Sequence, residues 1–366
     1  MDEILKTQLL LNSVGADVRH WKKIVSSGIN LCQILKDDYE RLKITGLTER
    51  AVAHIRENDI ARWAESEFER ASTLGVDIVS CDDINYPANL LDLKDPPLLL
   101  YWHGNMKSIS YSAVGVVGTR KCSSYGRETA EKIGAFCAAA HRILISGGAA
   151  GIDGFAHGGA CGHQGETVAV LGNGVDVVFP SSNRLLFEKI KECGALISEF
   201  PLGSGGEAWR FPKRNRIVAA LSDKLIVAEA PLKSGAMITA KIALELGREV
   251  WAVPGRINEA VSEGSNRLIF DGAFPYISHG LFFDFCDKSD GQSSLFSNAA
   301  PLNSADDLTQ DERSVMKILW RSGSQTVDNL AVEVKMSAAD VMKILAILSA
   351  KGYTYSSGPG RFSAKA

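Results

Sequence analysis

The chain has 366 residues, which is enough for two or three domains and a sizeable core. Its composition, 45% hydrophobic and 23% charged, is typical of a soluble globular protein. The net charge of −3 excludes a chain that is basic throughout, so any nucleic-acid site must be a local patch.

The cysteines and the apolar runs indicate the cellular compartment. The seven cysteines are scattered and never in C-x-x-C spacing, which argues against a disulfide framework or a zinc site and favours a reducing compartment. No apolar run approaches about 18 residues, and the N-terminus lacks the pattern of a secretory signal. We therefore expect a cytoplasmic protein with no membrane partner. The cysteines are Cys32, Cys81, Cys122, Cys137, Cys161, Cys193 and Cys286.

Residues 1–71 are predicted to form a small helical domain. The run Ile4–Ser13 is apolar, and Trp21–Val25 repeats at helical spacing. The stretch Leu42–Thr48 resembles the turn of a helix–hairpin–helix unit, which can hold DNA phosphates through backbone N–H groups. Lys43 is the only basic residue in that turn, so packing or protein contacts are favoured over DNA binding.

Residues 72–286 alternate between strand and helix patterns. Near-continuous runs of Val, Ile, Leu and Ala mark strands that are buried on both faces of a parallel sheet. The predicted fold is therefore α/β, a Rossmann-like, doubly wound, mostly parallel sheet. The predicted strands are Val76–Val79, Pro97–Tyr101, Ala113–Val117, Arg142–Ile145, Thr167–Leu171, Ala195–Ser198, Lys224–Ala228 and Glu249–Val253. The predicted helices are Gly126–Ala140, Ile152–Cys161, Asn183–Glu192, Trp209–Leu221 and Ala236–Leu246.

Two glycine-rich turns follow neighbouring strands of this pattern. Such turns let backbone N–H groups approach an anion, and the helix behind each turn adds the positive end of its dipole. Turns after neighbouring parallel strands open on the same edge of a sheet, so we predict a phosphate site there. Alternatively, the glycines serve only tight turns and close packing. The predicted site residues are Gly118, Thr119, Arg120, Ser146, Gly147, Gly148, Ala149 and Gly151.

A basic cluster begins the predicted helix 209–221. Cations interleaved with aromatic rings suit a single strand, because the cations bind phosphates and the rings stack on bases. Cations at a helix N-terminus oppose the dipole, which favours an anionic partner over a solvated helix start. Neither Arg120 nor the pair Lys213 and Arg214 lies in an apolar run, so we expect their substitution to leave folding intact. The predicted DNA-binding residues are Trp209, Arg210, Phe211, Lys213, Arg214, Asn215 and Arg216.

Further strand ends contribute small or hydroxyl residues to the same edge. Ser234 and Gly235 open another helix after the strand Lys224–Ala228, and Gly264–Asn266 is predicted to cap a later one. The sequence has no G-x-x-x-x-G-K-[ST] loop and no cluster of metal ligands. Asp153 is either a catalytic acid or, more commonly in such a position, part of a helix cap. We predict no catalytic residue, no metal and no cofactor.

The C-terminal part is predicted to be a polar linker, 287–307, followed by a separate domain, 308–366. Three helices, at 309–320, 327–334 and 337–349, precede a glycine-rich hairpin, which is the order of a winged helix. Thr309, Thr326 and Ser337 are the expected N-caps. The helix that would read DNA carries Asp340 and only Lys343, so an accessory or protein-contact role is favoured over duplex reading.

These motifs together resemble the DprA (Smf) family of bacterial DNA-processing proteins. The resemblance implies a non-enzymatic protein that binds incoming single-stranded DNA, protects it and helps load RecA in natural transformation. It also implies a sterile-alpha-motif-like N-terminal domain, a homodimer formed by the Rossmann-like domain, and a DNA pocket containing Arg120, Lys213 and Arg214. The motifs are Gly118-Thr119-Arg120, Ser124-Tyr125-Gly126, Ser146–Asp153, Ala156-His157, Gly172–Asp176 with Pro180, Ser198–Pro201, Phe211–Ile217, Ser234-Gly235, Thr239-Ala240 and Val253–Gly255.

Two other functions compete with this one. The first is a nucleotide-cleaving enzyme similar to the LOG phosphoribohydrolases, whose P-G-G-x-G-T-x-x-E signature includes a glutamate. This chain has Ser234-Gly235-Ala236-Met237 with no glutamate four residues on, so the carboxylate has no counterpart. The second is a regulator that reads duplex DNA through the winged helix, and the weakly basic recognition helix argues against it.

Overall fold

The computed structural model describes residues 2–27, 46–57, 60–106, 109, 112–289, 309–322, 325–334, 336–350, 354–358 and 361–364. The chain forms two compact units, residues 1–279 and 280–366. Most of the predicted hairpin turn Leu42–Thr48, and the predicted linker from residue 290 on, lie outside the described residues.

A nine-stranded sheet forms the centre of the first unit, in the order β1-β2-β6-β5-β4-β3-β7-β8-β9. Its strands from β6 to β9 are parallel, and β2 and β1 add an antiparallel edge. The predicted doubly wound, mostly parallel sheet is confirmed. The strands are β1 (Asp77–Ser80), β2 (Leu99–Gly104), β3 (Ala113–Val117), β4 (Ile143–Ser146), β5 (Thr167–Val170), β6 (Ala195–Ser198), β7 (Lys224–Val227), β8 (Glu249–Ala252) and β9 (Phe274–Pro275).

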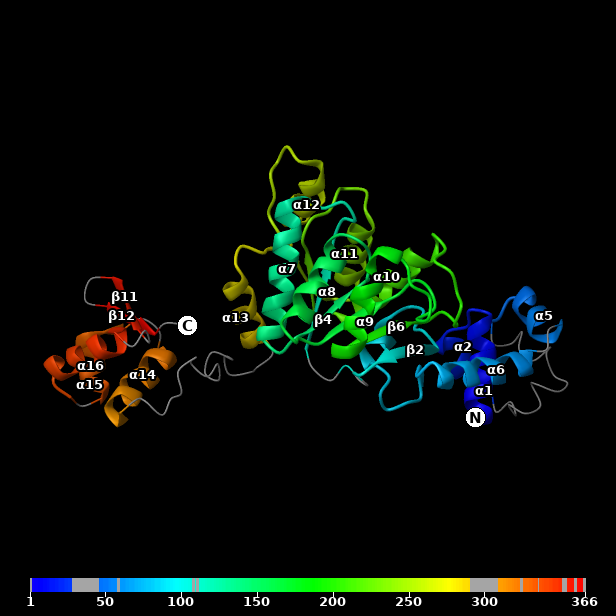
Figure 1. The fold of residues 1–366 in the computed structure, drawn as a ribbon, viewed down its shortest axis with the longest axis horizontal. Coiled ribbons are helices and arrows are strands. Elements are labelled where there is room, and N and C mark those ends of the chain that lie inside the picture. Colours follow the sequence, from blue (N-terminus) through cyan, green and yellow to red (C-terminus); the bar gives the residue numbers. More distant parts are fainter. Residues whose placement is uncertain are drawn as a thin grey trace. The chain divides into compact units, whose positions relative to one another are not determined.

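Helices cover both faces of this sheet (Figure 1). Successive strand residues point to opposite faces, so Val168 and Val170 pack in one apolar cluster with α10, while Ala169 packs in a second cluster with α9. The helices are α7 (Ser124–Ala139), α8 (Ile152–Gly162), α9 (Arg184–Cys193), α10 (Arg210–Leu221), α11 (Gly235–Glu245) and α12 (Glu263–Phe270), with short 3-10 turns η1 (Ala88–Asp92), η2 (Ser181–Asn183) and η3 (Ala260–Ser262). A further helix, α13 (His279–Ser289), begins at the last residue of this unit and continues into the second.

The predicted cap at Gly264–Asn266 is wrong, because α12 already begins at Glu263. Asn266 instead lies inside the helix and binds the end of the preceding strand. Its side-chain oxygen accepts the Gly255 N–H at 3.0 Å, and its amide nitrogen donates to the Gly255 carbonyl at 3.0 Å. The residue therefore joins α12 to the segment after β8.

Four described helices precede the sheet, and two of them, α1 and α6, contact its antiparallel edge (Figure 1). They are α1 (Glu3–Ser13), α2 (Val18–Ser26), α5 (Glu49–Glu57) and α6 (Ile60–Thr73). Leu9, Leu10 and Trp21 share one buried cluster with Leu99 and Tyr101 of β2. The N-terminal helices are therefore part of the same compact unit as the sheet.

Among the described residues from 309 to 364, three helices precede a hairpin, as the sequence predicted, and a short strand that the sequence did not predict pairs with this hairpin. Thr309, Thr326 and Ser337 each accept the backbone N–H three residues on through their side-chain oxygens, as expected for N-caps. The elements are α14 (Gln310–Ser322), β10 (Gln325–Thr326), α15 (Val327–Val334), α16 (Ala338–Ala350), β11 (Thr354–Gly358) and β12 (Arg361–Ala364), and the sheet order is β10-β12-β11.

Candidate nucleic-acid interface

The predicted phosphate edge lies at the carboxyl ends of β3, β4 and β7, which are neighbours in the sheet. Backbone hydrogen bonds join the segments that follow these strands. The Ile152 N–H donates to the Thr119 carbonyl at 3.2 Å, and the Thr119 N–H donates to the Glu229 carbonyl at 2.7 Å. Three strand ends thus meet around one point of the edge.

The glycines of these turns allow close backbone contact. Gly151 has φ of +82°, and a Cβ there would overlap the carbonyls of Thr119 and Arg120. A Cβ on Gly118 would lie 2.5 Å from the Ile152 side chain. Close packing is therefore one role of these glycines. The alternative interpretation of the sequence assigned them this role alone.

A cavity of about 670 Å³ opens between these turns and the first turn of α10. It gathers predicted site residues from four separate segments of the chain, together with Lys233, an exposed cation that the sequence interpretation missed although it directly precedes Ser234. We call it the core cavity. The predicted site residues that line it are Gly118, Thr119, Arg120, Ala149, Phe211, Arg214, Asn215, Ser234 and Gly235.

Arg120 is an exposed cation of this cavity. Its guanidinium carbon lies 5.3 Å from the centre of the Phe211 ring, in cation–π geometry. Phe211 in turn packs against Phe179, with ring centres 5.5 Å apart. Among the side chains that the structure describes, Arg120 forms no ion pair with a carboxylate, so its charge is available to an anion.

Arg214 lies beneath the cavity and is almost fully buried. Its guanidinium donates to the Val170 carbonyl and lies against Gly147. Burial lowers the pKa of Arg214 to about 10, while the negative charge of Asp153 opposes that shift. Arg214 thus supports the glycine turn from below.

Asp153 belongs to the same buried arrangement. Burial raises its pKa, against the attraction of Arg214 and hydrogen bonds from backbone N–H groups of the turn. One of these is the Gly147 N–H, which donates to its carboxylate at 3.2 Å. Through these contacts Asp153 stabilises the glycine turn that follows β4.

The remaining turn residues do not line the cavity. Ser146 is buried, and its hydroxyl donates to the Val116 carbonyl. Gly147 lies between Arg214 and Asp153, and Gly148 packs near Phe187. Ser146, Gly147, Gly148 and Gly151 therefore shape the edge from behind.

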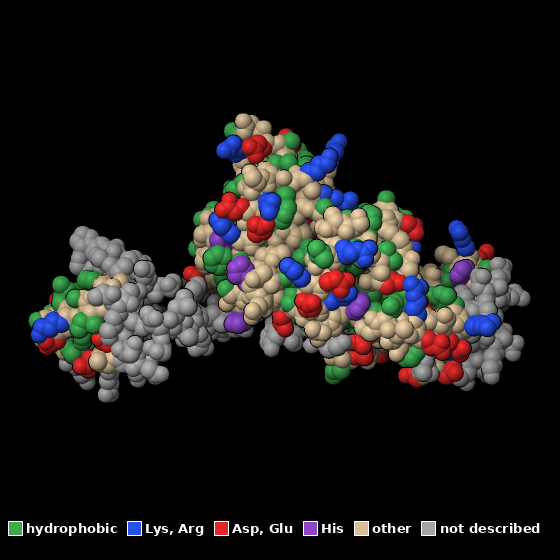
Figure 2. Space-filling model, in the orientation of Figure 1, with side chains coloured by type: hydrophobic (Ala, Val, Ile, Leu, Met, Phe, Trp, Pro, Cys, Tyr) green, Lys and Arg blue, Asp and Glu red, His purple; other side chains and the backbone are tan. Residues whose placement is uncertain are grey.

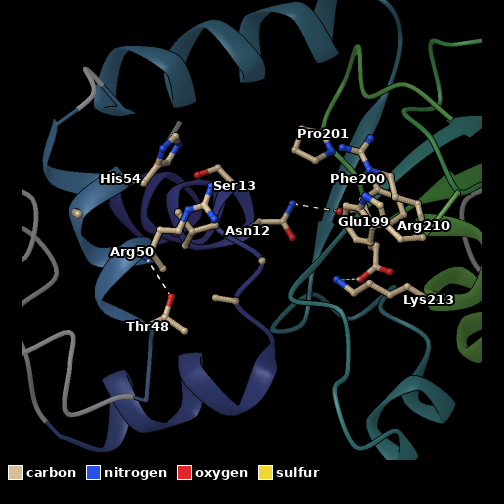
Figure 3. Close-up of a pocket in the computed structure, with 16 residues that line it drawn as sticks. Asn12, Ser13, Thr48, Arg50, His54, Glu199, Phe200, Pro201, Arg210 and Lys213 are labelled. Atoms are coloured by element: carbon tan, nitrogen blue, oxygen red, sulfur yellow. Dashed lines mark hydrogen bonds and ion pairs between the residues drawn. The ribbon is translucent and has the colours of Figure 1, made fainter. Parts of the chain in front are cut away.

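Trp209, Arg210 and Lys213 line a second cavity, of about 590 Å³, between the N-terminal helices and the sheet (Figure 3). Lys213 Nζ lies 3.4 Å from Glu199, and Arg210 pairs with Glu207 at 2.9 Å. The first turn of α10 consequently separates two cavities. We call this second one the helical-side cavity.

Arg216 departs from the predicted cluster. It is buried and pairs with Glu199 at 2.7 Å and Asp95 at 3.0 Å, and it lines neither cavity. A helix turns about 100° per residue, so positions 213, 214 and 216 face different directions. The four basic residues therefore do not form one phosphate track, and part of their charge is balanced by carboxylates that the sequence interpretation did not connect with them.

Charges of both signs are interspersed on the face of the molecule shown in Figure 2, in agreement with the small net charge.

None of the described helices is both long and apolar enough to cross a membrane. Within the described ranges, no group of His, Cys, Asp and Glu side chains is arranged to hold a metal ion. Cys161 and Cys193 lie with their sulfur atoms 3.0 Å apart, so these two of the predicted scattered cysteines are neighbours in space.

The model of the family described as DNA recombination-mediator protein A matches residues 77–285. The chain belongs to this family. Its match covers the whole nine-stranded sheet and both glycine turns, so the family resemblance inferred from the motifs is confirmed. The family is described as a mediator of DNA recombination and its relatives as DNA processing proteins, which favours a DNA-processing role over the phosphoribohydrolase alternative.

Curated relatives of the family are about 40% identical to this chain over the aligned residues. Protein Smf of Synechocystis is 41% identical over 52% of this chain and 49% of its own length. The DNA processing protein DprA of Streptococcus pneumoniae is 40% identical over 51% of this chain and 66% of its own length. The chain thus spans 49% to 66% of the length of these relatives.

Two solved structures resemble the fold. DNA processing protein A of Streptococcus pneumoniae superposes with a TM-score of 0.66 at 33% identity, over 76% of this chain and 96% of that one. DNA processing protein A of Helicobacter pylori, which has been described with a single-stranded DNA binding mode, gives a TM-score of 0.54 at 29% identity, over 58% of this chain and 96% of that one.

Proposed function

We propose that this chain binds single-stranded DNA in the core cavity, protects the strand and helps load RecA onto it during natural transformation and recombination. The observation that carries the DNA-binding part is Arg120, an exposed cation seated over Phe211 beside two glycine turns. The cation suits a phosphate and the ring suits an unpaired base. The single-stranded DNA binding mode described for the Helicobacter pylori relative supports the same assignment.

The other parts of the proposal rest on family resemblance. The α/β core forms a homodimer, which brings two cavities to one DNA molecule. The described N-terminal helices form a sterile-alpha-motif-like module, and the second unit is a winged helix with an accessory role. Asp340 of α16 pairs with Lys343 at 3.2 Å, so the basic residue of that helix is partly neutralised, which favours protein contacts over duplex reading.

The test compares a single-stranded oligonucleotide with the same sequence as a duplex, by fluorescence anisotropy across a salt series. The single strand should bind much more tightly, because Phe211 can stack only on an unpaired base. Arg120→Ala should weaken single-strand binding by roughly 1–3 kcal/mol, the scale of a charge-assisted hydrogen bond left unmade. Equal affinity for both DNA forms, or release of adenine from AMP by the purified protein, would overturn the proposal.

A further inference from the structure

The helical-side cavity is a second feature that the DNA-binding proposal leaves without an occupant. Its lining joins the N-terminal helices to the sheet, since Arg50 and His54 come from α5 whereas Glu199, Arg210 and Lys213 come from the α/β part (Figure 3). Arg50 is exposed, and no ion pair joins it to a carboxylate among the side chains that the structure describes. Cations from two different modules therefore face one space.

The charge of this cavity is positive. Among the described residues, Glu199 is the one carboxylate that lines it, and its oxygen is already shared by Arg216 at 2.7 Å and Lys213 at 3.4 Å. Arg50 adds a further positive charge to the lining, whereas the charge of Arg210 is balanced by Glu207 at 2.9 Å. An anion that enters the cavity thus meets an excess of cations over acceptors.

The cavity also has aromatic walls. Phe200 and Trp209 lie edge to face with ring centres 5.9 Å apart, and the Trp209 side chain is about half exposed, at 55%. The guanidinium of Arg210 lies 5.0 Å from the centre of the Phe200 ring and 5.3 Å from that of Trp209. Cations beside an exposed ring are the combination that single-stranded nucleic acid uses.

The two walls of the cavity are fastened to each other by hydrogen bonds. Asn12 of α1 donates to the Glu199 carbonyl at 3.2 Å, and the Leu202 N–H donates to Glu67 of α6 at 2.7 Å. Arg70 at the end of α6 pairs with Asp176 at 2.5 Å. These bonds join α1 and α6 to the sheet side of the cavity, and Val52 and Ile55 of α5 are buried in the same cluster as Leu9 of α1 and Leu99 of β2.

We infer that the helical-side cavity holds the phosphate backbone of the same DNA strand where it leaves the core cavity, with Arg50 as a phosphate contact supplied by the N-terminal module. The inference rests on the proposed function of the core cavity. Phe211 lines the core cavity, and its neighbour Arg210 lines the helical-side cavity, so a strand passes directly from one to the other over the first turn of α10. The N-terminal helices thereby lengthen the DNA site.

The test measures binding of oligothymidylates of roughly 5 and roughly 15 nucleotides, lengths that span the usual range of single-strand sites, to the full chain across a salt series. Arg50→Ala should weaken binding of the long strand several-fold and lower its slope of log affinity against log salt by about 0.7, the value for one phosphate contact. Binding of the short strand should stay at the parental value, and Arg50→Lys should restore the slope.

Lys22→Ala is the matched control, because Lys22 is an exposed cation on α2 of the same helices and does not line the cavity. It should leave both slopes unchanged. The inference is overturned if Arg50→Ala binds the long strand like the parent at every salt concentration, or if Lys22→Ala lowers the slope equally. If Arg120→Ala weakens both lengths while Arg50→Ala weakens neither, this inference alone fails; if the parent binds neither strand, the proposed function fails with it.

Discussion

Lys213 and Arg214 are adjacent in the sequence and have opposite environments in the fold. The Lys213 side chain is about one-third exposed, and its ammonium lies near Glu199. The Arg214 side chain is buried beneath the glycine turn, where it binds the Val170 carbonyl and attracts Asp153. The sequence predicted that substitution of Lys213 or Arg214 leaves folding intact, and the burial of Arg214 contradicts the premise of that prediction, because its charge is part of the interior.

We predict that Arg214→Ala destabilises the first unit by about 3 kcal/mol or more, since it leaves the buried Asp153 carboxylate without its counter-charge. Lys213→Ala should cost less than about 1 kcal/mol, the usual value of a partly exposed ion pair, because Arg216 remains to balance Glu199. Urea unfolding followed by circular dichroism measures both values. Equal midpoints for the two variants would contradict the assignment of Arg214 to the interior.

At the scale of elements, the turn from β4 into α8 depends on one backbone conformation. Gly151 is the N-cap residue of α8 and has a positive φ, and a Cβ there would overlap the carbonyl of Thr119 in the adjacent turn. The contact joins the two glycine turns, so this single position links the geometry of two strand ends.

Gly151→Ala should destabilise the protein by roughly 1–3 kcal/mol, the cost of a strained backbone conformation, and should weaken DNA binding by shifting Arg120. Gly158→Ala in the same helix is the matched control, because nothing lies within 4 Å of its Cβ position. It should be neutral or stabilising by up to about 1 kcal/mol, since alanine favours helix. Thermal melts report both changes, and a Gly151→Ala variant as stable as the control would refute this account of the turn.

His157 links α8 to β5 and makes stability depend on pH. Its ring is buried, with Nδ1 2.7 Å from the Thr167 hydroxyl, and burial lowers the pKa of His157 from 6.5 to about 3. In the unfolded chain this histidine takes up a proton near pH 6.5, whereas in the folded protein it stays neutral. The neutral, buried ring of His157 therefore stabilises the folded state fully above pH 6.5, and this stabilisation is lost as the pH falls toward 3.

We expect the free energy of unfolding of the parent to lose about 1.4 kcal/mol per pH unit between pH 6 and pH 4 from this group alone. His157→Gln should remove that part of the slope, so the difference between parent and variant should shrink as the pH falls. Urea titrations at three pH values measure it. A difference that stays constant with pH would show that His157 is protonated in the folded state.

At the scale of the whole molecule, the N-terminal helices and the sheet cannot be separated cleanly. Leu9 and Leu10 of α1 are buried in the same cluster as Leu99 of β2, although the sequence suggested a boundary between residues 71 and 72. Removing residues 1–71 would expose this apolar surface to water. The compact unit is residues 1–279, and this unit is the appropriate fragment for tests of assembly.

We predict that residues 1–279 form a homodimer at micromolar concentration, because the proposed dimer is formed by the α/β core. Light scattering of this fragment should give twice the mass of one chain, as should the full-length protein. If the fragment is a monomer and the full-length protein is a dimer, the dimer interface lies in residues 280–366. A monomer in both would contradict the proposed dimer.

The order of the elements and the position of the glycine edge could be predicted from the sequence. Strands buried on both faces are apolar throughout, and turns between strand and helix carry glycine, so β3 to β8 were located to within one residue at each end. Arg120 was predicted as a site residue because it directly follows such a turn, and it lines the core cavity. Both signals come from residues that are close together in the chain, so they can be recognised in a single sequence.

The sequence by itself determined the α/β sheet, its parallel strands and the edge at which its glycine turns meet, because these depend on short-range periodicity and backbone geometry. Only the tertiary structure decided whether each charged side chain is buried, paired or exposed. Whether Arg214, Arg216 or Lys213 faces an anion depends on Asp153, Asp95 and Glu199, whose contacts span between 14 and 121 positions of the chain. Helical rotation and long-range packing set these pairings, so residues adjacent in sequence acquired separate roles.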